Sequence, residues 1–90
     1  MQPNEIKAYL NRASAYIELG KLNEARNDYT SVIRINPKFA NIYAMRGKVS
    51  FQMKSWDAAL SDFRLAVAAN PNDQESKEKI AGILKDHPVP

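Results

Sequence analysis

The fold is decided by residues 36–71, NPKFANIYAMRGKVSFQMKSWDAALSDFRLAVAANP, which begin and end with the same Asn-Pro pair. The two pairs are 34 residues apart, and sliding residues 6–39 by 34 places six positions on identical residues. Such a period is typical of stacked structural repeats. The sequence therefore predicts one unit at 6–39 and a second at 40–73. Besides the Asn and Pro positions, the identical pairs are Tyr9 with Tyr43, Arg12 with Arg46, Ala25 with Ala59 and Asp28 with Asp62.

Each unit has the apolar spacing of two amphipathic helices, because large and small apolar residues recur every three or four positions. Asn4 is a candidate N-cap just before the first unit; within the unit, Gly20 breaks the helical pattern and Pro37 ends it. The apolar stripes are Tyr9, Ala13, Tyr16 and Ile17, then Leu22, Ala25, Tyr29, Val32 and Ile33. The small residues are expected where two helix backbones approach closely, since larger side chains would push the axes apart.

The second unit repeats this plan, with Lys54 at the place of Gly20 and Ser55 as a candidate N-cap. Its stripes are Tyr43, Gly47, Ser50 and Phe51, then Trp56, Ala59, Leu60, Phe63, Ala66 and Val67. Residues 74–86 then predict one further helix. Asn72 and Glu75 have the spacing of a capping box. Ile80, Ile83 and Leu84 give this helix a single narrow apolar face, which suits the open end of a repeat stack.

Composition excludes several classes of function. Hydrophobic residues make up 44% of the 90 residues and charged residues 26%, so one small folded domain is expected at 1–90. No apolar run approaches the about 20 residues of a membrane span, and a missing signal pattern makes the cytoplasm the default location. The net charge of +3 is interspersed rather than a basic stripe, so no nucleic-acid partner is expected.

Catalytic and metal chemistry lack the residues that they need. The chain has no cysteine, and its one histidine, His87, lies beside a proline near the end of the sequence. A single histidine can neither build a metal site nor complete a catalytic triad with these neighbours. The sequence therefore predicts no catalytic residues, no metal site, no cofactor and no enzyme activity.

These residues resemble the tetratricopeptide repeat family, whose 34-residue repeat places large, small and aromatic residues and a closing proline in a fixed order. The matching residues are Tyr9, Ala13, Tyr16, Ala25, Tyr29, Val32 and Pro37, then Tyr43, Gly47, Ser50, Ala59, Phe63, Ala66 and Pro71. Val32 stands where the family has a small residue, and Ser50 stands where the family has an aromatic one. The neighbouring Phe51 is expected to fill part of the space that Ser50 leaves. The resemblance covers about nine-tenths of the chain.

The resemblance implies an all-α fold, a right-handed α-solenoid of two helical hairpins plus a capping helix, five helices in all. It also implies a non-catalytic module, adaptor or co-chaperone-like, whose first helices line a concave groove for an extended peptide or a helix of a partner protein. Carried over by register, the groove residues are Lys7, Leu10, Asn11, Ser14, Asn41, Ala44, Met45, Lys48, Glu78 and Lys79, with Glu75 beside them.

One branch of the family grips the acidic C-terminal tails of cytosolic heat-shock chaperones with two Lys, two Asn and one Arg. The stretch YLNRASAY, residues 9–16, resembles the middle repeat of that clamp, and Asn11 falls on its Asn. Asn41 and Met45 occupy the places where the next repeat should supply Lys and Arg. A complete carboxylate clamp is therefore not expected, although Lys48 is a candidate substitute cation.

The repeated Arg12 and Arg46 lie outside the groove register, so a structural role is favoured for them. We expect each to pair with a repeated aspartate, in its own hairpin or from Asp28 to Arg46. A separate alternative concerns the first helix, which has no preceding hairpin to cover it. Partly exposed Ile6, Ala8 and Ala15 predict either a fragment of a longer repeat array or a homo-oligomer that assembles through this face.

Overall fold

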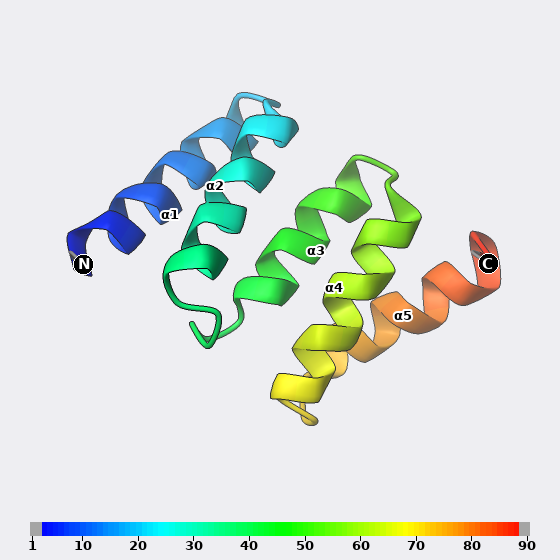
Figure 1. The fold of residues 1–90 in the computed structure, drawn as a ribbon. Coiled ribbons are helices and arrows are strands. Elements are labelled where there is room, and N and C mark those ends of the chain that lie inside the picture. The colour runs from blue at the N-terminus through cyan, green and yellow to red at the C-terminus, as the bar shows by residue number, and fades with distance from the viewer. Residues whose placement is uncertain (1–2, 89–90) are drawn as a thin grey trace.

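The computed structural model describes residues 3–88, and every regular element among these residues is an α-helix (Figure 1). The helices alternate in direction along the chain, and each packs against the next one in sequence. This arrangement confirms the expected all-α solenoid. The helices are α1 (Pro3–Glu18), α2 (Leu22–Ile35), α3 (Ile42–Gln52), α4 (Trp56–Ala69) and α5 (Gln74–Asp86).

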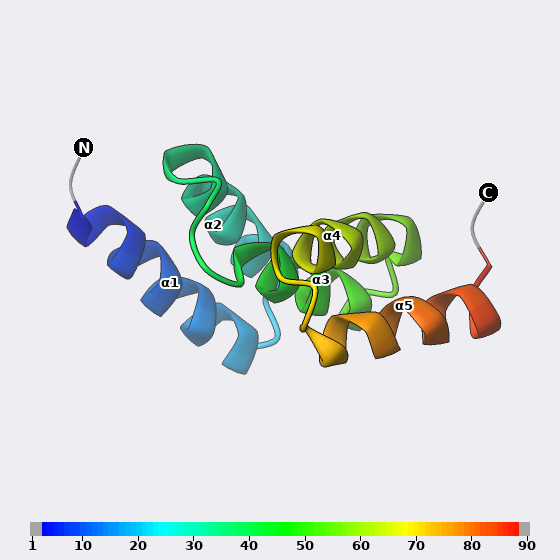
Figure 2. The same cartoon turned by 90° about the horizontal axis from the view of Figure 1, so that it is seen from below.

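The helices form two layers, which are seen edge-on in Figure 2. The second helices of the hairpins, α2 and α4, lie on one side, and α1, α3 and α5 lie on the other. The two chain ends lie at opposite ends of the stack. The first helices therefore share one surface of the molecule, and the second helices share the opposite one.

Small residues bring the helices of each hairpin close together, as the sequence predicts. Ala13, Ala25 and Ala59 are fully buried. At Gly47 a Cβ atom would lie 3.0 Å from Cε1 of Phe63, which is too close for an ordinary contact. The lack of a side chain at Gly47 therefore lets α3 approach the ring of Phe63 on α4 closely.

The core consists of two clusters. The first is built around Ala13, Ala25, Tyr29, Val32, Ile42 and Val49, and the second around Ala59, Leu60, Phe63 and Ile83. Ile83 is fully buried and Ile80 packs against the second cluster, so α5 covers the end of the second hairpin. Leu84, which the sequence predicts on the same face, is instead 45% exposed. His87 stacks on Trp56 with ring centroids 3.8 Å apart, which ties the end of α5 back to α4.

The repeated Asn-Pro pairs form identical turns. The side-chain oxygen of Asn36 accepts from the backbone N–H of Lys38 at 3.1 Å, and that of Asn70 accepts from the N–H of Asn72 at 3.2 Å. Asparagine favours this local bond, and the following proline cannot extend a helix. Each repeat therefore ends with the same two residues because the same turn closes its second helix, although α3 begins at Ile42 and α5 already at Gln74.

The exits of α1 and α3 also share one conformation. Gly20 has φ +76° and Lys54 has φ +61°, both in the left-handed region. Glycine adopts this region without a steric penalty, whereas lysine does not. These two positions, 34 residues apart, thus have the same backbone conformation. In the second repeat this conformation costs conformational energy, because the residue is a lysine.

Two predicted N-caps are wrong, and a third is confirmed only in position. α1 begins at Pro3, so Asn4 lies inside its first turn, where a proline start is tolerated. α5 begins at Gln74, one residue too late for an Asn72 cap, and Asp73 caps it by accepting from Ser76 N at 3.0 Å and from Ser76 Oγ at 2.6 Å. Ser55 occupies the N-cap position of α4 without a side-chain cap bond.

Candidate functional site

The surface of α1 carries four of the residues predicted for the groove. Lys7, Asn11 and Ser14 are exposed. Leu10 is half-buried, and it packs against the first core cluster together with Met45 of α3. The polar residues are therefore available to a ligand, whereas Leu10 and Met45 also contribute to packing inside the chain.

The predicted residues on α3 have three different settings. Asn41 precedes the helix with φ +64° and is exposed, so it belongs to the turn rather than to the helix face. Ala44 is only 7% exposed and is part of the core. Lys48 is exposed and points across to α5, where its Nζ lies 2.9 Å from Oε1 of Glu75. Within this set, Lys48 is the α3 residue best placed to contact a ligand.

A hollow of about 340 Å³ lies between α3 and α5, and we call it the α3–α5 hollow. Phe51 of α3 lies against it, and the Nζ of Lys79 lies 4.4 Å from the centre of the Phe51 ring. A smaller hollow of about 150 Å³ adjoins it and extends to Lys48 and Gln52. The residues that line the α3–α5 hollow are Phe51, Glu75, Glu78, Lys79 and Gly82.

The structure thus brings Lys48, Glu75, Glu78 and Lys79 together around a shared depression, and it adds three residues that sequence reasoning missed. Gly82 lies 34 residues after Lys48, so the repeat register alone could have identified it. The sequence predicts a packing role for Phe51, and its ring does contact Trp56 and Phe63 edge-on. No signal in the sequence identified Gln52.

The pairing of Lys48 changes the prospects of a carboxylate clamp. As a substitute cation, Lys48 would need its charge available to a ligand. Its ammonium instead meets Glu75, and a ligand carboxylate would have to displace that side chain. Both partners are about half exposed, so the pair itself contributes little to stability. The positive charge of Lys48 is therefore balanced by Glu75 at this point of the first-helix surface.

The repeated Arg and Asp residues pair within their own hairpins, as predicted. Arg12 Nε and Nη2 donate to Asp28 at 2.9 and 2.6 Å, and Arg46 donates to Asp62 at 2.8 Å through the same two atoms. Both aspartates are buried. The hydrogen bonds to Asp62 raise the pKa of the Arg46 guanidinium above its ordinary value, against the opposing effect of burial.

The two pairs differ in what covers them. Arg46 Nη1 also donates to Thr30 Oγ1 of α2 at 3.2 Å, and the Arg46 side chain is 23% exposed. Arg12 belongs to the first hairpin and is 57% exposed. A second contact between repeats runs from Arg26 Nη1 to Ser50 Oγ at 3.2 Å, which explains the polar residue at that buried place. These bonds fix how the repeats stack, and they lie outside the candidate groove.

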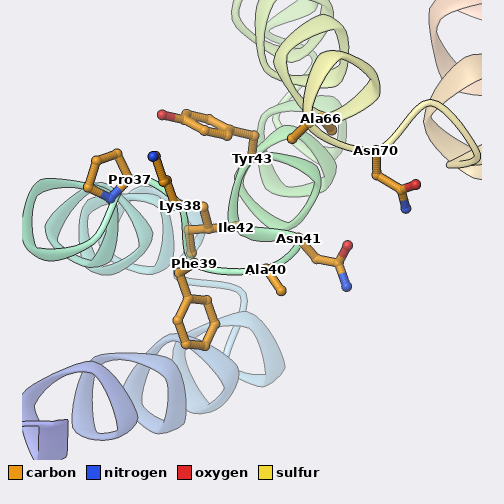
Figure 3. A pocket seen from close by; sticks show the side chains of 10 residues that line it. Pro37, Lys38, Phe39, Ala40, Asn41, Ile42, Tyr43, Ala66 and Asn70 are labelled. Atoms are coloured by element: carbon orange, nitrogen blue, oxygen red, sulfur yellow. The ribbon is translucent and has the colours of Figure 1, made fainter.

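Another hollow, of about 320 Å³, lies at the turn between α2 and α3 (Figure 3). The turn residues Pro37 to Asn41 line it together with Ala66 and Asn70 from the end of α4. In Figure 3 the Phe39 ring is turned toward α1, where it packs against the first core cluster. Of the predicted groove residues, only Asn41 reaches this hollow, so it is separate from the α3–α5 hollow.

Within residues 3–88, no group of three or more His, Cys, Asp or Glu side chains is arranged to hold a metal ion. None of the described helices is long and apolar enough to cross a membrane.

Comparisons with known proteins relate the chain to proteins whose names include Hsp70, Hsp90 and DnaJ. It is 40% identical over 73 residues to Hsp70-Hsp90 organizing protein 1 of Glycine max and 36% identical over 73 residues to Hsp70-Hsp90 organizing protein 3 of Arabidopsis thaliana, covering 81% of this chain in each case. It is 30% identical over 83 residues, or 92% of this chain, to human DnaJ homolog subfamily C member 3. The chain spans only 13–16% of the length of these relatives.

A solved structure and two family models agree on the fold. The Arabidopsis OM64 TPR domain superposes with a TM-score of 0.80 at 28% identity, covering 90% of this chain and 67% of that one. A TPR repeat model matches residues 13–54, and a tetratricopeptide repeat model matches residues 40–73. Together the two models span residues 13–73, and they fall on the helical hairpins. They show that the chain belongs to the tetratricopeptide repeat family.

Proposed function

We propose that this chain is a non-catalytic adaptor that binds an extended or helical segment of a partner protein along α1, α3 and α5. The observation that carries the proposal is the α3–α5 hollow, which lies on the layer of first helices beside exposed polar residues of the predicted register. Asn11 offers both donors and acceptors for a peptide backbone, and Lys7 and Ser14 extend this surface along α1.

The proposal includes a co-chaperone-like role, in which the bound segment belongs to a chaperone or to a protein that works with one. The relatives whose names include Hsp70, Hsp90 and DnaJ support this choice. A cytoplasmic setting and the lack of catalysis are parts of the same proposal. The charge-balanced pair of Lys48 and Glu75 argues against copying the carboxylate clamp onto this chain.

The test begins with a displayed library of random twelve-residue peptides, selected on the wild-type chain. Affinities of the enriched peptides are then measured by fluorescence anisotropy against a groove variant, Lys7→Ala with Asn11→Ala and Lys48→Ala. All three side chains are exposed, so the melting temperature should stay within about 2 °C of the wild type. Binding should weaken by about tenfold or more, because a few residues usually carry most of an interface energy.

A matched control places the same kinds of change on the second helices. The variant Asn27→Ala with Arg34→Ala and Arg64→Ala also removes one amide and two cations from exposed positions, on α2 and α4. Its affinity should equal that of the wild type. Unchanged binding by the groove variant, or an equal loss in the control, would move the site away from the first helices.

Self-association through the N-terminal face is a second candidate function. Ala8 and Ala15 are exposed on α1, as expected, while Ile6 is half-buried against the first core cluster. The greater exposure of Arg12 than of Arg46 has the same origin, because no helix among residues 3–88 covers α1 as α2 covers α3. Sedimentation equilibrium at micromolar to millimolar concentration tests it: a dimer that Ala8→Glu abolishes supports this function, and a monomer throughout rejects it.

A further inference from the structure

Two of the three glycines have a structural reason among residues 3–88, and the third has none there. Gly20 has a left-handed backbone, and Gly47 lies against the ring of Phe63. Gly82 lies within α5 (Gln74–Asp86), and a Cβ atom there would have no neighbour within 4 Å among the described residues outside its own helix backbone and chain neighbours. Glycine within a helix is destabilising relative to alanine, so folding alone gives no reason for it.

Gly82 lines the α3–α5 hollow together with Phe51 of the facing helix. The missing side chain leaves space on α5 opposite an aromatic ring. A small residue at such a place lets another molecule approach the helix backbone closely. The Phe51 ring and the room at Gly82 fit one aliphatic side chain, which would share the ring with the Lys79 ammonium 4.4 Å from its centre.

The charges around the hollow cancel. Lys48 and Glu75 are 2.9 Å apart, and Glu78 and Lys79 add one charge of each sign. A terminal carboxylate placed here would lie beside two glutamates and compete with one of them for Lys48. An uncharged side chain faces no such penalty, since buried or half-buried charges need partners. The electrostatics therefore favour an uncharged anchor.

We propose that the α3–α5 hollow receives an aliphatic side chain from an internal segment of the partner, and that Gly82 is the residue that keeps room for it. This inference rests on the proposed function, because it specifies which part of the first-helix surface holds the partner and by which chemistry. The anchor is a Leu, Ile or Met side chain that contacts Phe51 and the backbone of α5 at Gly82.

Two neighbouring substitutions test the inference with the enriched peptides described above. Gly82→Ala should raise the melting temperature by about 4 °C through helix propensity, and it should weaken peptide binding about tenfold because its methyl group stands where the anchor approaches the α5 backbone. Ala81→Gly is the matched control, because Ala81 is exposed on α5 and does not line the hollow. It should lower the melting temperature by a similar amount and leave the affinity unchanged.

Changes in the peptide complete the test. Replacing the shared aliphatic residue with Asp should weaken binding about tenfold or more, whereas amidating the C-terminus should leave affinity within about twofold. The inference is overturned if the Gly82→Ala variant binds the peptide as tightly as the wild type does. It is also overturned if amidation of the peptide abolishes binding. If the groove variant of Lys7, Asn11 and Lys48 weakens binding and Gly82→Ala does not, only this inference fails. If no peptide is enriched, or if neither variant weakens peptide binding, both this inference and the proposed function fail.

Discussion

The ion pair between Arg46 and Asp62 should contribute more to stability than its counterpart in the first repeat. Asp62 accepts two hydrogen bonds of 2.8 Å from one guanidinium, and its side chain is 5% exposed. Replacing Arg46 with Met keeps the apolar stem but leaves a buried carboxylate without its partner. Breaking a fully buried pair costs about 3–5 kcal/mol, and the partial exposure of Arg46 reduces the expected cost to about 2–3 kcal/mol.

The first repeat provides an internal control for this expectation. Asp28 is as buried as Asp62, but Arg12 is 57% exposed, so removing Arg12 admits water to the carboxylate. Around Arg46 the hydroxyl of Thr30 and helix α2 limit that access. Because charges interact more strongly where water is excluded, the coupling between Arg12 and Asp28 should be smaller than that between Arg46 and Asp62.

Two double-mutant cycles measured by urea unfolding check the comparison. One uses Arg46→Met and Asp62→Asn, and the other uses Arg12→Met and Asp28→Asn; urea is preferred because it does not screen charges. The expected coupling free energy for the second repeat is about 1.5–3 kcal/mol. A coupling below about 0.5 kcal/mol there, as for an ordinary surface pair, or one no larger than in the first repeat, would refute the reasoning.

Three further substitutions test local features by thermal or urea denaturation. Gly47→Ala should destabilise by about 1–3 kcal/mol because its Cβ would lie 3.0 Å from the Phe63 ring, and an unchanged stability would contradict the close helix approach. Lys54→Gly should stabilise by about 0.5–1 kcal/mol by relieving φ +61°; a loss would show that no strain is present. Asp73→Ala should cost about 1 kcal/mol at pH 7. The bonds from Ser76 lower the pKa of Asp73, so this difference should hold above about pH 4 and shrink as the pH falls through the lowered folded-state pKa; a pH-independent difference would argue against the charged cap.

The repeat period made most of the fold predictable from sequence. Residues matched at a spacing of 34 occupy equivalent positions in the structure, including the buried alanines and the paired Arg12 and Asp28. The left-handed exit shared by Gly20 and Lys54 was also implied by register, although lysine gives no local signal for it. Repetition was informative because each unit must present the same surface to its neighbour.

Helix starts were less predictable, because several polar residues compete to cap each one. Asn72 and Asp73 are adjacent, and both are good capping residues. The backbone of Asn72 is held by Asn70 in the repeat-closing turn, which leaves the N-cap position of α5 to Asp73. This choice depends on the turn geometry, which no spacing rule for capping residues includes.

The repeat register located a shared surface, but it did not predict which of its side chains are buried or paired. It placed Ala44 in the groove, where the structure buries it against the core, and it could not reveal that Lys48 meets Glu75 across two helices. That contact depends on how far α5 lies from α3. The hollow at Phe51 and Gly82 has the same origin, since it is formed between helices rather than along one.

The most direct test of the first-helix surface is an amide chemical-shift titration of the labelled chain with an enriched peptide. The proposal predicts that the largest shifts lie on α1, α3 and α5, with Lys48, Glu75 and Gly82 among them, and that α2 and α4 change little on their exposed faces. Shifts concentrated on α2 and α4, or confined to the turn hollow around Phe39, would contradict it.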